Sequence, residues 1–265
     1  YLRFIKGLVD TQDIDLNVSR EMLQNNPAVA KISKSLVGKI LRELKKVSEK
    51  NADGYKSFWK EYGAVLKEGL YEDAERKEAL LDLCRFSTNE NDDPISLSGY
   101  VEKMPEKQKD IYYISAETKD QALASPHLEG FKSKKIPVLI MTDAIDQFWL
   151  PMVGSFKEKK FTSITQGQIN LDDLDEKNKD KKEDDKNEKE KKDKEYVDLV
   201  AQLKVVLGDQ VKDIRLSSKL TDSPVCLVAD EGDMDIAMEQ LMAQRDTNYK
   251  GCLLYTSDAA DDMQC

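Results

Sequence analysis

Apolar residues recur at helical spacing through the first third of the chain. After Pro27 they share one helix face and lysines occupy the other, which predicts a long helix, and two further helical stretches follow it. Separators between the stretches are Gly54, Gly69 and the loop "STNENDDP". We therefore expect a small helical bundle over residues 29–92, with its aromatic residues in the core rather than on a base-stacking platform. The apolar positions are Val29, Ile32, Leu36, Ile40, Leu44 and Val47, then Phe58, Trp59, Tyr62, Val65 and Leu66, then Leu80, Leu81, Leu83 and Cys84.

The period of the pattern changes after Pro94. "DIYYIS" and "IPVLIM" are short apolar runs of β-prone residues, and the segment between them has room for a crossover helix. This spacing predicts two parallel strands in a βαβ unit. "DAIDQFWLPMVGSF" then indicates a short helix that ends near Gly154, and "KKFTSIT" indicates another strand. We therefore expect a small α/β module over residues 93–170.

A charged segment follows this module. Between Asp172 and Glu195 the chain is almost entirely Asp, Glu and Lys, with Leu174 as its one apolar residue. Such a composition predicts a linker over residues 171–195, either a disordered tether or an isolated charge-paired helix. Beyond it, "YVDLVAQLKVVLGDQ" predicts a helix, "VKDIRLS" and "SPVCLVAD" predict strands, and "MDIAMEQLMAQ" predicts a helix. We expect an incomplete third module over residues 196–251, and the fold class is α/β (α+β).

Both ends of the chain carry a pattern of their own. Leu2, Ile5, Leu8 and Val9 already follow helical spacing and no Met opens the chain, so we expect a fragment that begins inside a domain. At the other end, "CLLYTSDAADD" resembles the translation of a sequencing adapter. Residues 252–265 therefore carry no functional expectation.

Composition narrows the class of protein. The chain is acidic, with a formal net charge of -10 and a pI near 4.9, which argues against a nucleic-acid partner because such partners need a basic surface. No apolar run approaches the ~20 residues that span a bilayer, and no signal peptide is visible, so a membrane partner is not expected. Four cysteines lack CxxC spacing and the chain has a single histidine, so we expect no metal site, reduced thiols and a cytoplasmic location.

Familiar catalytic motifs are missing from the sequence. It contains no GxxxxGK, GxSxG or HExxH pattern, and "VGKI" is a lone Gly-Lys pair within a helical pattern. His127, in "SPHLEG", is interpreted as a capping or loop-packing residue. The sequence therefore predicts no self-contained active site.

One short stretch, "LNVSREMLQNNP", departs from the usual pattern of a helix start. Asn17 is a good N-cap residue and Glu21 suits the first turn, but Arg20 places a cation where the helix dipole is already positive. A cation beside free backbone N–H groups favours an anion at that point. We therefore expect Arg20 to serve an anionic ligand.

Three separated segments resemble, in order, the heat shock protein 90 family of chaperones, and its bacterial branch most. They are "YLRFIKGLVDTQDIDLNVSREMLQ", "SPHLEGFKSKKIPVLIMTDAID" and "VKDIRLSSKLTDSPVCLVAD". The resemblance covers Tyr1 to about Gln244. It implies that residues 1–28 end the large α/β module of a middle domain, that the middle domain runs to residue 170, and that residues 196–251 start a dimerisation domain.

The same resemblance implies an ATP-dependent chaperone for unfolded or partly folded client proteins. Arg20 would reach the γ-phosphate of ATP, held with Mg by an N-terminal ATPase domain of the same protein, with Asn17 and Gln24 as supporting residues. This chain alone would hydrolyse no ATP and would be a monomer, whereas the full-length protein would be a homodimer. Two features depart from the family: Asp15 stands where proline is common, and the charged run beginning at Asp172 follows the middle domain.

Two questions stay open from the sequence. Phe148, Trp149 and Met152 put much apolar area on one short helix, which predicts a client-binding surface. The alternatives are burial of these aromatic side chains in a core, or exposure of only one of the two. For the whole chain, the alternative to a chaperone segment is a non-enzymatic acidic interaction scaffold. In that reading Arg20 forms only a surface ion pair, which contributes little.

Overall fold

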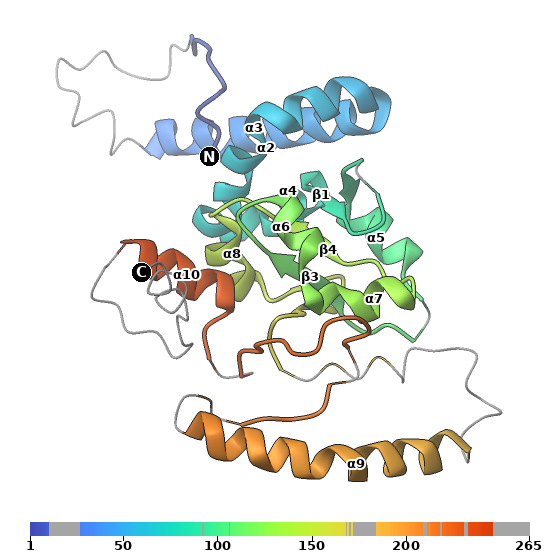
Figure 1. Ribbon diagram of the computed structural model, residues 1–265. Coiled ribbons are helices and arrows are strands. Elements are labelled where there is room, and N and C mark those ends of the chain that lie inside the picture. The colour runs from blue at the N-terminus through green and yellow to red at the C-terminus, as the bar shows by residue number, and fades with distance from the viewer. Residues whose placement is uncertain are drawn as a thin grey trace, which may run out of the picture. The chain divides into compact units, whose positions relative to one another are not determined.

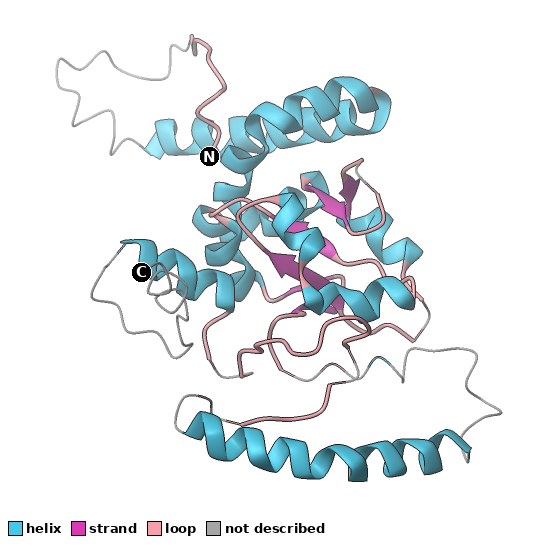
Figure 2. Ribbon diagram, in the orientation of Figure 1, coloured by secondary structure: helices cyan, strands magenta, loops and turns pink. Residues whose placement is uncertain are grey.

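The chain forms two compact units that alternate along the sequence. A computed structural model describes residues 1–10, 27–91, 93–105, 107–167, 169, 171, 184–208, 211, 213–217, 219–230 and 233–245, with backbone only at 184–195 and 245 (Figure 1). Unit 1 comprises Tyr1–Ser87, Asp93–Lys103 and Ile145–Glu158, and unit 2 comprises Thr88–Asp92, Met104–Ala144 and Lys159–Cys265. Helices make up most of the regular structure (Figure 2), and together with parallel and antiparallel strand pairs they confirm the α/β fold class.

Unit 1 is mainly helical, as the apolar pattern predicts. Its core is built from leucines of α3 and α4 together with Tyr55, Tyr100 and Trp149. A short antiparallel pair joins Arg85 to Ser96 and Phe86 to Ile95. The elements are α2 (Pro27–Lys50), α3 (Ala52–Glu72), η1 (Ala74–Arg76), α4 (Lys77–Leu83), β1 (Arg85–Thr88), β2 (Ile95–Ser96), α5 (Leu97–Lys103), α8 (Asp146–Val153) and β5 (Ser155–Phe156).

Three details of unit 1 differ from the sequence expectation. Gly54 and Gly69 lie inside α3 and do not separate helices; Asn51 caps that helix by accepting from the Gly54 N–H at 2.9 Å. Gly69 is close-packed, because a Cβ there would come within 2.7 Å of the Tyr1 ring. Tyr1–Asp10 is not helical.

The aromatic cluster of α3 sits at the margin of unit 1 rather than at its centre. Phe58 and Trp59 are half-buried and Tyr62 is exposed. The N-terminal segment covers part of the cluster, since the Phe4 ring lies 5.3 Å from Phe58 and 5.0 Å from Tyr62. The central aromatic residue of α3 is Tyr55, whose hydroxyl donates to the Leu83 carbonyl at 2.7 Å.

Unit 2 contains the predicted parallel strands. β3 pairs in parallel with β4 on one side, with Tyr113 opposite Leu139, and with β6 on the other, with Tyr112 opposite Thr162. The crossover between β3 and β4 is a series of short helices, the first opened by a capping box between Thr118 and Gln121. The elements are β3 (Ile111–Ser115), α6 (Lys119–Ala124), η2 (Pro126–Leu128), α7 (Glu129–Ser133), β4 (Leu139–Met141), β6 (Lys159–Ser163), α9 (Asp184–Leu207) and α10 (Ile236–Arg245).

The core of unit 2 lies where the crossover helices pack on β3 and β4. Tyr112 and Phe131 meet edge to face with their centroids 5.2 Å apart. The remaining fully buried members are aliphatic. They are Ile114, Ala122, Leu128, Ile136, Val138, Ile140, Ile164 and Leu171.

The two strands predicted after the charged segment are wrong within the described residues. Residues 211–217 and 223–230 contain a single bridge, between Gln166 and Ala229, and Val225 and Leu227 are exposed. A β-ladder needs a partner edge along its length, and this segment meets one only at Ala229. The helices at 196–210 and 234–244 are confirmed as α9 and α10, although α9 already begins at Asp184, inside the charged run.

Candidate functional site

The three residues of the expected ATP contact lie outside the described residues. Asn17, Arg20 and Gln24 precede Pro27, where the described chain resumes with α2. Their roles stay predictions. The part of the expected site that the structure places is the proposed client-binding helix.

That helix, α8, begins and ends as the sequence predicts. Gly154 stops it in the left-handed region, with φ of 69°, and donates its N–H to the Leu150 carbonyl at 3.0 Å. Pro151 lies in the last turn, where it lacks the N–H that would donate to the Gln147 carbonyl. The result is a helix of 8 residues with two distinct faces.

One face of α8 is fixed in the core of unit 1 by a buried charge pair. The Lys67 ammonium of α3 lies 2.9 Å from the Asp146 carboxylate, and both side chains are almost inaccessible, at 4% and 0% exposure. Trp149 Nε1 donates to Asp146 Oδ1 at 2.7 Å. The Lys67 ammonium also lies 4.7 Å from the Phe86 ring centroid, which adds a cation–π contact.

The opposite face of α8 carries Phe148 and Met152. These residues are spaced i, i+4 and share a side of the helix, with Phe148 half-buried and Met152 58% exposed. Trp149 is fully buried, as the core alternative held. The predicted client-binding set is therefore divided: Phe148 and Met152 border the surface of unit 1, and Trp149 supports them from within.

Sequence reasoning missed Lys67 and Asp146. A signal was present, because Lys67 belongs to a stripe of α3 whose other members, Gly63, Leu66 and Leu70, are all buried. A lysine at an interior position of an apolar stripe predicts a buried acidic partner. Nothing in the sequence identifies that partner as Asp146.

The histidine and two of the cysteines considered in the sequence lie in the described part of the chain. His127 is buried in the η2 turn, where its backbone N–H is capped by Ser125, in agreement with the loop-packing interpretation. Cys84 is buried and Cys226 is half-buried, and neither forms a disulfide. Within the described ranges, no group of His, Cys, Asp and Glu side chains could hold a metal ion, and no helix has the length and apolar character of a membrane span.

The described residues form an α/β fold, and the sequence has no GxxxxGK, GxSxG or HExxH pattern. The family model described as "Hsp90 protein" matches residues 1–259, and the chain belongs to that family.

Its curated relatives are chaperones. Proteins called "Chaperone protein HtpG" match at 48% identity over 242 residues in Roseobacter denitrificans, covering 91% of this chain and 38% of the relative. The relative from Paramagnetospirillum magneticum is 46% identical over 242 residues, which cover 91% of this chain and 38% of the relative. The Wolbachia pipientis wMel relative matches at 41% over 260 residues, covering 94% and 39%. The chain thus spans less than two-fifths of the length of these relatives.

Proposed function

We propose that this chain is the middle segment of an ATP-dependent molecular chaperone that binds unfolded or partly folded proteins. The observation that carries the proposal is the Hsp90 family match over residues 1–259, together with relatives that are named as chaperones. Clients would contact the Phe148 and Met152 face of α8. Full-length protein would act as a cytoplasmic homodimer.

In this proposal the segment around Arg20 completes an ATPase site on another domain. ATP with Mg²⁺ would be bound by an N-terminal domain of the same protein. A guanidinium can give two aligned hydrogen bonds to phosphate oxygens as charge develops on the γ-phosphate. Asn17 and Gln24 would support that arginine, and the chain by itself would not hydrolyse ATP.

The experiment is a set of Arg20 variants in full-length protein. Arg20→Ala should lower steady-state ATP turnover by about 10- to 1,000-fold, the range for single preorganised charge donors, and leave nucleotide affinity nearly unchanged. Arg20→Lys should recover only part of the rate because it keeps the charge and loses the planar fork. Arg42→Ala removes an exposed arginine of α2 and is the matched control.

Turnover of the Arg20→Ala protein equal to that of the wild type, with the fold intact, would remove the mechanistic part of the proposal. It would favour the alternative of an acidic interaction scaffold. The coding sequence upstream of Tyr1 offers a second discriminator: a nucleotide-binding domain there supports the chaperone, and its absence supports the scaffold.

A further inference from the structure

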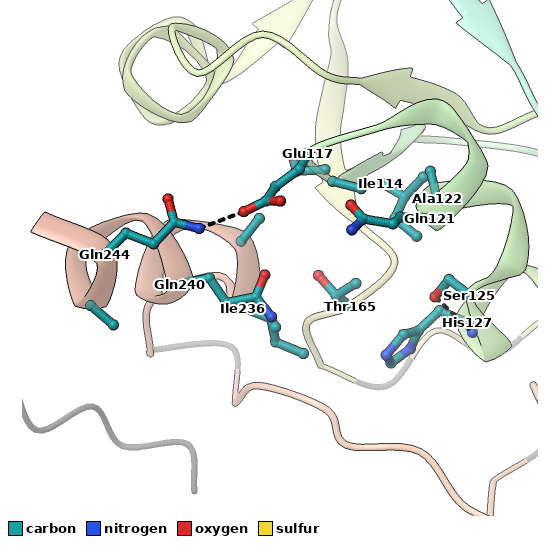
Figure 3. Close-up of a pocket in the computed structure, with 14 residues that line it drawn as sticks. Ile114, Glu117, Gln121, Ala122, Ser125, His127, Thr165, Ile236, Gln240 and Gln244 are labelled. Atoms are coloured by element: carbon teal, nitrogen blue, oxygen red, sulfur yellow. Dashed lines mark hydrogen bonds between the residues drawn. The ribbon is translucent and has the colours of Figure 1, made fainter. Parts of the chain in front are cut away.

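Unit 2 contains an open pocket that the proposed chaperone function does not use. It has a volume of about 570 Å³, within the range of about 300–1,000 Å³ typical of small-ligand sites. Its walls come from the end of β3, from α6 and η2, from Thr165 after β6, and from one side of α10 (Figure 3). The pocket is therefore assembled from segments far apart in the sequence.

The position of the pocket is one at which α/β folds bind ligands. Ser115 is the last residue of β3, and Thr165 follows the end of β6 at Ser163, so the pocket lies at the carboxyl ends of two adjacent parallel strands. The connection after β3 leads to β4, on the side away from β6. Crevices outside the carboxyl ends of the strands are the usual ligand positions of open α/β sheets.

Two polar atoms in the wall of this pocket have no hydrogen-bond partner among the described residues. They are Ser115 Oγ and His127 Nδ1, and their residues are only 7% and 6% exposed. A buried polar atom without a partner is costly, so each calls for a hydrogen-bonding group that the described chain does not supply. Figure 3 shows the His127 ring on the pocket side of η2.

His127 offers an acceptor rather than a charge. Burial is the main cause that lowers its pKa, the Lys219 ammonium acts in the same direction, and Leu227 and Asp235 oppose them. The ring is therefore neutral at pH 7. Because a hydrogen bond with the Leu227 backbone favours the protonated ring nitrogen and Nδ1 has no partner, the proton belongs on Nε2. Nδ1 is left as a lone pair that requires a donor.

The charge of the lining has one sign. Glu117 is its only ionised side chain, and no Lys or Arg is among the lining residues. The Glu117 carboxylate accepts from the Gln244 amide, and the amides of Gln121 and Gln240 point toward the same space (Figure 3). Among the lining residues an anion would meet a carboxylate and no cation, whereas a cation rich in donors would meet several acceptors. The nearby Lys219 ammonium does not line the pocket and donates to the Ile164 and Gly167 carbonyls.

We propose that this pocket binds a guanidinium group. A guanidinium has five N–H donors in one plane and no acceptor, which suits a site with a carboxylate, amide oxygens, and an imidazole lone pair and a hydroxyl in its wall. The group could belong to an arginine side chain of a bound peptide or to a small free guanidine. The inference is independent of the ATPase role of Arg20.

The test is calorimetric titration of the whole chain at 0.15 M salt with acetyl-Gly-Arg-Gly-amide. The matched probe carries citrulline in place of arginine, which keeps the planar shape and removes the charge. We expect the arginine peptide to bind at least about tenfold more tightly, the effect of one charge-assisted hydrogen bond. Propylguanidine, a free guanidine with a single charge, tests the source: equal or tighter binding assigns a small molecule, and weaker binding assigns a peptide.

Variants separate this site from general attraction to an acidic chain. Glu117→Gln should weaken arginine-peptide binding by about 10-fold or more, because it removes the carboxylate of the lining. Asp120→Asn removes an exposed carboxylate of α6 that does not line the pocket, and it should leave binding unchanged. The ¹⁵N resonance of His127 Nδ1 should move toward that of a hydrogen-bonded nitrogen when the peptide is added.

Three results would overturn the proposal. Equal affinity for arginine and citrulline peptides would show that charge is not recognised. Equal weakening by Glu117→Gln and Asp120→Asn would show attraction to the acidic surface only. If neither peptide binds at millimolar concentration and the Nδ1 resonance is unchanged, water is the hydrogen-bond partner of Ser115 Oγ and His127 Nδ1.

Discussion

At the scale of single residues, two kinds of charged interaction hold segments together in different ways. Lys67 and Asp146 form a pair with almost no access to solvent, 79 residues apart in sequence. Glu129 forms a cap: one carboxylate oxygen accepts the backbone N–H groups of Thr221, Asp222 and Ser223 at 2.8, 3.0 and 3.2 Å, and the other accepts the Ser223 hydroxyl. The first holds two helices of unit 1 together, and the second ties a late segment to α7 of unit 2.

Breaking the buried pair should destabilise unit 1 strongly. Asp146→Asn keeps an oxygen for Trp149 Nε1 but leaves the Lys67 ammonium without its carboxylate, so the free energy of unfolding should fall by about 3–5 kcal/mol. Urea unfolding followed by tryptophan fluorescence measures this change, because Trp59 and Trp149 both lie in unit 1. Adding Lys67→Met to Asp146→Asn should restore much of the loss.

The control is an ion pair of similar chemistry at the surface. Lys45 and Asp82 lie 3.1 Å apart with 53% and 30% side-chain exposure, so Asp82→Asn should change the free energy of unfolding by less than about 1 kcal/mol. Equal effects of Asp82→Asn and Asp146→Asn would mean that the Lys67 pair is hydrated in solution.

Glu129 should make the attachment of residues 221–223 sensitive to acid. The Ser223 hydroxyl and then the N–H groups of Asp222 and Thr221 lower the pKa of Glu129 from 4.5 to about 2. A carboxyl whose pKa is lower in the folded state stabilises fully above its unfolded value, so the attachment is complete above pH 4.5 and is lost as pH falls through about 2. Amide resonances of Thr221 and Asp222 should report this midpoint, and a midpoint near 4.5 would contradict the cap. Glu129→Gln should abolish the titration.

At the scale of elements, α8 has one face buried in the core of unit 1 and one face that borders the surface. Asp146 and Trp149 face the core, and Phe148 and Met152 face outward. The apolar residues along "DQFWLPMV" could not show which face is buried, because every residue after Gln147 is apolar. Trp149 Nε1 donates to Asp146, whose charged partner Lys67 lies on α3 and therefore outside this run.

Separate substitutions on α8 should therefore have opposite effects. Trp149→Ala should lower the free energy of unfolding by about 3–5 kcal/mol, since it opens a cavity in the core. Met152→Ala should change it by no more than about 0.5 kcal/mol while weakening the binding of an unfolded client, measured by fluorescence anisotropy of the labelled client. Unchanged client affinity in a Phe148→Ala, Met152→Ala protein that melts normally would remove α8 from the client surface.

Sequence periodicity predicted helices better than late strands, for a physical reason. α3, α4, α8 and α10 satisfy their hydrogen bonds locally, so pattern and end signals suffice to find them. The runs "VKDIRLS" and "SPVCLVAD" have strand composition, but a strand exists only if another edge is available, and pairing is not written in the run itself. β3, β4 and β6 were found because they can pair with one another.

At the scale of the whole molecule, the two units are interleaved along the chain. Unit 1 needs three segments, and the last, Ile145–Glu158, carries α8. The sequence pattern predicts consecutive modules, because shifts in composition mark local boundaries and cannot show that a helix returns to an earlier unit. Of the candidate site, the bounds of the proposed client-binding helix could be predicted from the sequence but its two faces could not, and the pocket of unit 2 had no sequence signal except His127.

Interleaving predicts which truncations fold. A chain ended after Lys103 should lose the cooperative melt of unit 1, because it lacks Asp146, Trp149 and Leu150. A chain ended after Glu158 contains every segment of unit 1 and should retain that melt. Thermal unfolding followed by circular dichroism compares the two. A sharp transition in the shorter chain would show that α8 is dispensable for the bundle.

The sequence separation of the Lys67–Asp146 pair also sets the order in which its two residues are synthesised on the ribosome. Lys67 is made 79 residues before Asp146, which at about 5–20 residues per second is an interval of roughly 4–16 s. Throughout that interval the nascent α3 presents a lysine without its carboxylate and the apolar face that α8 later covers. A protein proposed to shield unfolded chains therefore passes through a stage of its own synthesis in which it needs the same protection.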